Sequence, residues 1–171
     1  MANQEHVKAI KQGVHYWNKW REENPQVAPD LAWANLVGVS LSNADLEGAN
    51  MKLAFCRGGD LENANFKNAS LYGTNLEESN LTGAQMEGAS LEGAHLRKAD
   101  LTGANLSNTN MKLANLQDAV LTRADLSGAS KLTLEQCEEV KTLFEAKLDS
   151  IILERIKDSH PGLLLDTNSQ D

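Results

Sequence analysis

Apolar side chains recur at every fifth position between residues 29 and 128, and this spacing dominates the chain. The central residue of each five is Leu fifteen times, Met three times, and Phe and Cys once each. Ala stands two positions earlier in fourteen of the twenty repeats. An internal repeat that runs this far without a shift of register predicts a solenoid. The twenty central residues, which we expect to form its core, are Leu31, Leu36, Leu41, Leu46, Met51, Cys56, Leu61, Phe66, Leu71, Leu76, Leu81, Met86, Leu91, Leu96, Leu101, Leu106, Met111, Leu116, Leu121 and Leu126.

A period of five fits neither of the ordinary secondary structures. Five residues advance an α-helix by about 500°, so successive leucines would spiral around it and form no stripe. In a flat strand an odd period sends alternate leucines to opposite faces. The pattern therefore predicts a chain that turns a corner in every repeat and keeps the central residue inside. Gly ends nine of the twenty repeats, and Gly and Asn suit corners that need unusual backbone angles.

The repeats have the form A(D/N)LxG, as in Ala44-Asp45-Leu46-Glu47-Gly48 and Ala124-Asp125-Leu126-Ser127-Gly128. This form resembles the pentapeptide-repeat family. The resemblance implies a mainly β fold, a right-handed quadrilateral β-helix with four repeats in each of about five coils. The segment from Tyr16 to Pro25, which runs on to Pro29-Asp30-Leu31, is similar to bacterial, especially cyanobacterial, members. Most of those members have no assigned function, so the resemblance indicates the fold and says little about the function.

Charged residues provide a test of four repeats per coil, because residues 20 apart would then be stacked neighbours. One such row reads Arg57, Glu77, Arg97, and its signs alternate. A second row, Glu47, Lys67 and Glu87, alternates in the same way. Opposite charges on neighbouring strands attract, so the alternation favours a coil of 20 residues.

Both ends of a solenoid expose its core and need covering. At the front, apolar residues at helical spacing predict a helix over about residues 3–22. At the back, Thr133 and Gln136 form a capping box, and the apolar stripe that follows predicts about 20 helical residues, as one helix or as two divided at Asp149-Ser150. We therefore expect a helical cap in 1–28, the β-helix in 29–130, a second helical cap in 131–165 and a disordered tail in 166–171.

The cysteines, histidines and charges of the chain argue against catalysis, metal or cofactor binding, and nucleic-acid binding. Cys56 and Cys137 are isolated, the four histidines are dispersed, and no nucleophile or phosphate-binding motif occurs. We expect no catalytic, cofactor-binding or metal-binding residue, hence no cofactor and no enzyme. The net charge of −8, without a basic stretch, disfavours direct nucleic-acid binding. With no apolar run long enough for a membrane span and no signal peptide, we expect a cytoplasmic protein.

Two functions of different class fit these features. The first is a non-enzymatic scaffold that binds an unknown protein partner, with the carboxy-terminal helices as the candidate site of a homodimer contact. Its candidate interface residues are Trp33, Leu53 and Leu113, which share one outward face, and Phe144, Leu148 and Ile152 near the carboxy terminus. The second is a DNA mimic that inhibits a type II topoisomerase such as gyrase, an activity that the family resemblance implies for some members. This chain departs from such members because its centres are nearly all Leu, no loop interrupts the repeats and acids alternate with bases.

Overall fold

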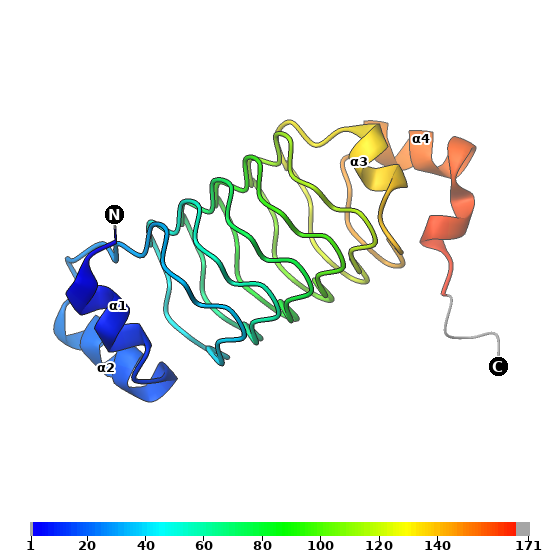
Figure 1. Ribbon diagram of the computed structural model, residues 1–171. Coiled ribbons are helices and arrows are strands. Elements are labelled where there is room, and N and C mark those ends of the chain that lie inside the picture. Colours follow the sequence, from blue (N-terminus) through cyan, green and yellow to red (C-terminus); the bar gives the residue numbers. More distant parts are fainter. Residues whose placement is uncertain (1, 167–171) are drawn as a thin grey trace.

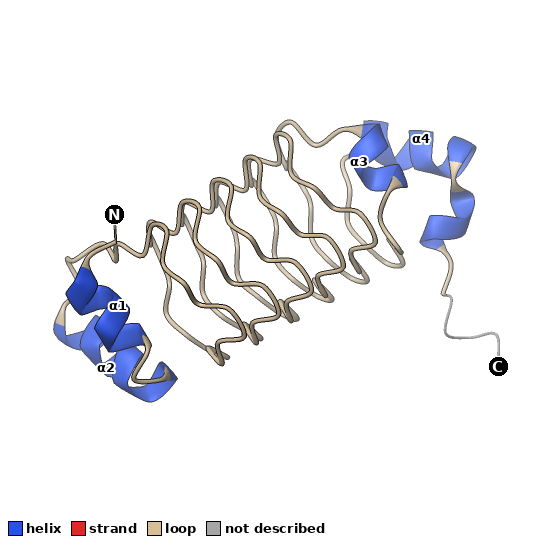
Figure 2. Ribbon diagram, viewed as in Figure 1, coloured by secondary structure: helices blue, strands red, loops and turns tan. Residues whose placement is uncertain are grey.

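The computed structural model describes residues 2–166 as a stack of coils with helices at both ends (Figure 1). Two helices precede the coils, α1 (Gln4–Ile10) and α2 (Val14–Glu23). Helix α3 (Leu134–Glu138) interrupts the last coil, and α4 (Ser150–Ser159) and the short 3-10 helix η1 (Pro161–Leu164) follow it. Within the described residues the coils contain isolated parallel bridges and no continuous strand, so Figure 2 shows them as loops.

Residues 20 apart in the sequence lie side by side in neighbouring coils. Parallel bridges at this spacing begin with Asp30 and Asn50 and continue to Asn110 and Ser130. Each repeat donates backbone hydrogen bonds to the next coil, as in the 2.8 Å bond from the N–H of Leu31 to the carbonyl of Asn50. Four repeats therefore complete one turn, which confirms the period that the charge rows predicted.

A left-handed residue forms the corner of every repeat. The last residue of each five, from Trp33 to Gly128, has a φ between 54° and 68°. Gly adopts this region freely and Asn with little strain, whereas other L-residues lose about 1–2 kcal/mol there. The large apolar residues that accept this strain are Trp33, Leu53 and Leu113.

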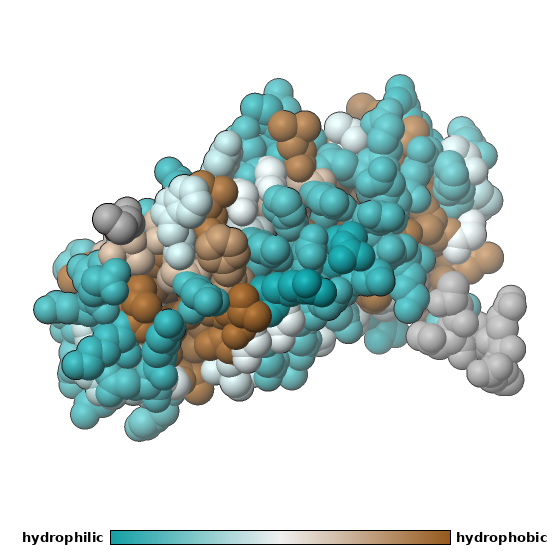
Figure 3. All heavy atoms as spheres, viewed as in Figure 1, coloured by the Kyte–Doolittle hydropathy of each residue, from teal (hydrophilic) through white to brown (hydrophobic). Residues whose placement is uncertain are grey.

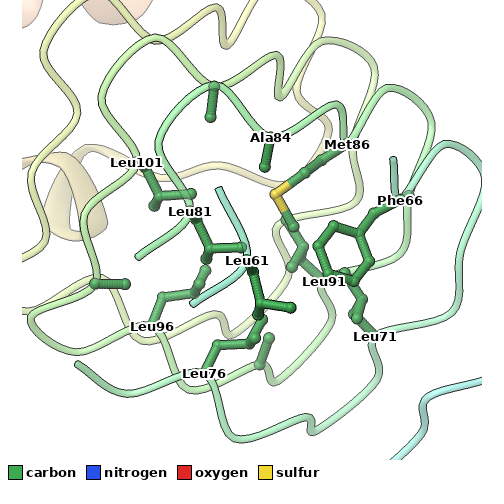
Figure 4. Packing of buried hydrophobic residues seen from close by; sticks show 14 of the residues in the cluster. Leu61, Phe66, Leu71, Leu76, Leu81, Ala84, Met86, Leu91, Leu96 and Leu101 are labelled. Carbon is green, nitrogen blue, oxygen red and sulfur yellow. The ribbon is translucent and has the colours of Figure 1, made fainter. Parts of the chain in front are cut away.

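The core is a set of columns inside the coils. All twenty central residues are 2% exposed or less. Figure 4 shows Leu61, Leu81 and Leu101 following one another in a single column, with the ring of Phe66 across the interior. Where the small inward residue is a Ser or Thr, its hydroxyl donates to a backbone carbonyl, as in the 2.7 Å hydrogen bond from Thr74 Oγ1 to the Met51 carbonyl on the preceding coil.

The amino-terminal segment differs from the single helix predicted over residues 3–22. Gly13, with a φ of 99°, separates α1 from α2, and that backbone conformation is open to Gly but strained for other residues. The side chains of Ile10 and Trp17 are fully buried in the core cluster. Trp17 also donates from Nε1 to the carbonyl of Asp45 at 2.8 Å, which ties α2 to the first coil.

The carboxy-terminal segment departs further from prediction. The capping box of Thr133 and Gln136 is confirmed, but α3 ends at Glu138 and the chain then returns to the coil. Bridges join Val120 to Thr142 and Asp125 to Lys147, so residues 139–149 begin a sixth coil. The expected helix over this stretch was wrong.

The reason lies in the sequence of the segment itself. Leu143 and Leu148 stand five residues apart, as do the centres of the regular repeats, and Ala146 precedes Leu148 by two. Glu145 is left-handed, with a φ of 56°, like the corner residues of the regular repeats. The turn of α3 adds two residues, so the spacing to the previous coil is 22 and the repeat is concealed.

Helix α3 closes the part of the fifth coil that the sixth does not reach. Gln136 donates from Nε2 to the carbonyls of Met111 and Ala114, at 2.9 and 2.7 Å. Helix α4 then begins at Ser150, the division that the sequence had offered as its second alternative, and buries Ile156 completely. The tail predicted to be disordered, 166–171, lies outside the described residues except for its first residue.

Candidate interaction surface

Large apolar side chains are exposed on the first three coils. Trp33 is 57% exposed, Tyr72 47% and Phe55 46%. Leu53, two residues from Phe55, is half-buried. Trp33, Leu53 and Tyr72 line one hollow, and we call these three residues the apolar patch. Figure 3 shows hydrophobic surface gathered over the amino-terminal coils, whereas the middle coils are mostly hydrophilic.

A hollow of about 460 Å³ opens within the apolar patch. It is lined by Ala32, Trp33, Lys52, Leu53, Ser70, Tyr72 and Ser90. The N–H of Trp33 donates to the Lys52 carbonyl at 2.9 Å, and that of Leu53 donates to the Tyr72 carbonyl at 2.9 Å. The backbone ladder therefore holds Trp33, Leu53 and Tyr72 on three successive coils.

The corner column beside the hollow contains both large residues and glycines. It reads Trp33, Leu53, Gly73, Gly93 and Leu113, one residue from each coil. Leu113 is 77% exposed, but the two glycines separate it from the hollow. Of the three residues that the sequence placed on this face, Trp33 and Leu53 line the hollow together, and Leu113 lies apart from them.

Sequence reasoning missed the exposed aromatic residues Tyr72, which lines the hollow, and Phe55. Both occupy outward positions that are otherwise mostly polar, one immediately after a central residue and one immediately before. A signal for Tyr72 was available, because Tyr72 immediately precedes Gly73, which stands 20 residues after Leu53 in the corner column. A search limited to the corner column does not find them.

The polar side-chain groups in the hollow form no hydrogen bond or ion pair within residues 2–166, although Tyr72 interacts electrostatically with Lys112. Lys52 Nζ forms no ion pair, and the indole N–H of Trp33 and the hydroxyl of Tyr72 form no hydrogen bond. Nearby charges differ in this respect, since Lys112 lies 2.8 Å from Glu92 and Arg57 lies 3.0 Å from Glu78.

Ion pairs between coils stabilise the charged form of certain carboxyl groups. A hydrogen bond from Lys112 holds the pKa of Glu92 below its ordinary value. Hydrogen bonds from Ser127, with a smaller contribution from Lys147, lower the pKa of Asp125. These pairs lie on the surface and connect one coil to the next.

The predicted carboxy-terminal interface residues lie at the opposite end of the molecule. Phe144, Leu148 and Ile152 are partly buried, and the last two pack against the core. The apolar side chains left exposed there are Ile151, at 73%, and Leu165, at 63%. The two groups of predicted interface residues therefore do not form one surface.

The described residues hold no group of three or more His, Cys, Asp or Glu side chains that could bind a metal ion. Cys56 and Cys137 are both free and buried, and burial raises the pKa of each thiol to about 12. His6 has a structural contact, since its Nδ1 accepts a 2.9 Å hydrogen bond from the N–H of Asp30. No helix in residues 2–166 combines the length and the apolar character that crossing a membrane requires.

Comparison with known proteins identifies the family. The family model for pentapeptide repeats, which holds eight copies, matches residues 30–68, 60–97 and 94–130. The chain belongs to the pentapeptide repeat family, as its A(D/N)LxG repeats predicted. Its coils are therefore those of the right-handed quadrilateral β-helix that defines this family. No curated protein matches the chain.

Solved structures of family members cover the coils. A pentapeptide repeat protein from the thylakoid lumen of Arabidopsis thaliana is 32% identical, with a TM-score of 0.56 over 57% of this chain and 68% of that one. HetL, from the cyanobacterium Nostoc and involved in regulating heterocyst differentiation, is 34% identical over 58% of this chain and 54% of its own, with a TM-score of 0.44. Rfr23 from the cyanobacterium Cyanothece is 33% identical over 65% of each chain, with a TM-score of 0.35.

Proposed function

We propose that this chain is a non-enzymatic interaction module that binds a protein partner through the apolar patch. The observation that carries the proposal is the placement of Trp33 and Leu53 at left-handed corners, where each costs about 1–2 kcal/mol. Trp33 recovers little of that cost by burial, because more than half of its side chain is exposed. Single exposed apolar residues are ordinary, whereas a cluster of them marks an interaction site.

The apolar patch also has the composition and rigidity of a binding site. Trp and Tyr are the residues most often responsible for binding energy at protein interfaces. Here the backbone ladder holds Trp33, Leu53 and Tyr72 on three successive coils, so little chain entropy is lost when a partner binds. A partner would meet a surface that is already formed.

Self-association through the carboxy-terminal helices has weaker support. The apolar residues that suggested it have another use, because Leu143 is buried in the sixth coil and Ile156 against it. A light-scattering mass of the intact chain tests this alternative, with Ile151→Lys and Leu165→Lys combined as the variant. Truncation after Lys131 is unsuitable because it removes the sixth coil, which covers the core.

DNA mimicry also has weaker support. A duplex presents about one negative charge per 1.7 Å, so a mimic needs continuous acidic rows. Here acids pair with bases on the next coil, as Glu87 does with Lys67 at 4.0 Å and Glu92 with Lys112 at 2.8 Å. We expect no inhibition of gyrase supercoiling at micromolar protein concentration.

A cytoplasmic location is part of the proposal. Both cysteines are free thiols, as is usual for proteins in reducing compartments. The thylakoid-lumen relative shows that the same fold is also used elsewhere.

Affinity purification with two matched variants tests the proposed function. Trp33→Gly and Leu113→Gly each remove an exposed apolar side chain from a left-handed corner of the same face. Glycine suits both positions, so both variants should fold. We expect partners retained by the unmodified chain and by Leu113→Gly to be lost from Trp33→Gly. An identical set of partners for all three proteins would refute the assignment of the apolar patch.

A further inference from the structure

The class of partner follows from the polar groups of the hollow, provided that the apolar patch is the docking site proposed above. The side chains of the hollow that form no hydrogen bond or ion pair within residues 2–166 are the Trp33 indole, the Lys52 ammonium, the Tyr72 hydroxyl and the hydroxyls of Ser70 and Ser90. An indole N–H and an ammonium can only donate, and a hydroxyl donates readily. The hollow therefore presents hydrogen-bond donors beside aromatic rings.

The backbone beneath the hollow is already occupied. The carbonyls of Lys52, Ser70 and Tyr72 each accept a hydrogen bond from the preceding coil, at 2.8–2.9 Å. These three carbonyls are not available to a partner strand, which disfavours main-chain augmentation of the coil at this site. Recognition has to come from the side chains.

We propose that the hollow binds a proline-rich segment in the polyproline II conformation. Such a segment makes no internal hydrogen bonds, and its prolines have carbonyl acceptors but no N–H donors. It thus complements a site of donors, and its rings pack on aromatic side chains. An amphipathic helix is a poorer match, since its carbonyls are bonded within the helix and would leave the donors of the hollow unpaired.

Charge adds a second feature of the ligand. Lys52 is exposed and has no ion-pair partner within residues 2–166, whereas Lys112, on the same face, is engaged by Glu92. An acidic residue beside the prolines would pair with Lys52, and a basic one would be repelled. The segment is therefore both proline-rich and acidic at one end.

The size of the hollow sets the length of the contact. Its lining residues come from four successive coils, and stacked coils lie about 4.8 Å apart. This span of about 14 Å corresponds to roughly four or five residues of polyproline II, which rises 3.1 Å per residue. A short linear motif fills it.

Selection from a displayed library of random twelve-residue peptides tests the inference on the full chain. Peptides are selected on the unmodified protein and counter-selected on Trp33→Gly, whose fold is checked by circular dichroism. Enrichment of proline runs flanked by Asp or Glu supports the inference. Enrichment of Trp33-dependent peptides with another pattern overturns it but leaves the proposed function standing. Recovery of no Trp33-dependent peptide overturns both.

A titration with synthetic peptides then tests the charge. The probes are eight prolines preceded by two glutamates, the same run preceded by two lysines, and a version with alanines in place of the prolines. We expect Lys52→Glu to weaken binding of the first probe at least tenfold and to strengthen binding of the second, and Leu113→Gly to change neither. Equal binding of the proline and alanine peptides, or no response to Lys52→Glu, would overturn the inference.

Discussion

A Cβ atom on Gly73 would lie 2.7 Å from Cδ2 of Leu53, so the side of the hollow formed by Leu53 depends on a glycine one coil away. The same relation recurs at other corners, for example where a Cβ on Gly128 would lie 2.7 Å from Oδ1 of Asn108. At these corners the side chain leans over the next coil, where a Cβ atom would be too close to it. The corner glycines therefore shape the surface as well as turning the chain.

Comparison of Gly73→Ala with Gly93→Ala separates these two roles. Both residues are left-handed, with φ of 59° and 65°, so each substitution should cost about 1 kcal/mol in the free energy of unfolding. Only the first displaces Leu53, since nothing lies within 4 Å of a Cβ on Gly93. We expect similar urea midpoints for the two variants and weaker partner binding for Gly73→Ala alone. Equal binding by both variants would show that Leu53 does not shape the site.

Replacing the strained apolar corners by glycine should stabilise the fold. Leu113 is 77% exposed at a φ of 57°, so Leu113→Gly relieves strain and loses little packing. We expect the free energy of unfolding to rise by up to about 1 kcal/mol, the entropy gained by the unfolded chain offsetting part of the relief. Asn43→Gly is the control, because Asn already tolerates this region, and its effect should be smaller. A loss of stability in Leu113→Gly would mean that Leu113 packs on a neighbour.

A sixth coil and a continuous helix predict different effects of substitutions in residues 139–152 on the free energy of unfolding. Leu143 is fully buried at a central position, whereas Ile151 is 73% exposed on α4. We expect Leu143→Ala to lower the free energy of unfolding by about 2–5 kcal/mol and Ile151→Ala to change it by less than about 0.5 kcal/mol. Urea denaturation of both variants measures the difference. Comparable effects of the two substitutions would argue against a sixth coil.

Acid should remove part of the stability that the pair of Glu92 and Lys112 contributes. The hydrogen bond from Lys112 lowers the pKa of Glu92 from its ordinary value of 4.5, so the folded protein binds this proton less readily than the unfolded chain. The contribution is present above about pH 4.5 and disappears as the pH falls through the lowered pKa. We expect the stability difference between the unmodified chain and Glu92→Gln to shrink as the pH is lowered through this range in urea titrations. Lys112→Met should behave in the same way, and a difference that is independent of pH would contradict this account.

The regular part of the fold could be predicted because its signal is redundant. An apolar residue stands at all twenty central positions, and a departure from Leu at one of them, such as Cys56, does not hide the period. The sixth coil could not be predicted in the same way, since α3 shifts its spacing to 22 and the centres Leu143 and Leu148 also fit a helical stripe. Burial against the fifth coil decides between the two, and the local sequence does not contain that information.

The apolar patch was only partly predictable for a different reason. Stacking by 20 places Trp33 beneath Leu53, and the structure agrees. Whether a residue three coils away joins the same surface depends on the side chains between them, and Gly73 and Gly93 leave Leu113 isolated from Leu53. Tyr72 lines the same hollow but lies one position before the corner column, so an inspection of that column alone does not find it.

The most direct test of docking at the apolar patch uses the three tryptophans of the chain as reporters. Trp17 is fully buried with its indole bonded to Asp45, and Trp20 stacks on it at 5.2 Å, whereas Trp33 is exposed in the hollow. In a 15N spectrum of the full chain, addition of the selected peptide or purified partner should shift the Trp33 indole resonance and leave those of Trp17 and Trp20 in place. A bound complex in which the Trp33 resonance does not move would contradict the proposal that this chain docks its partner through the apolar patch.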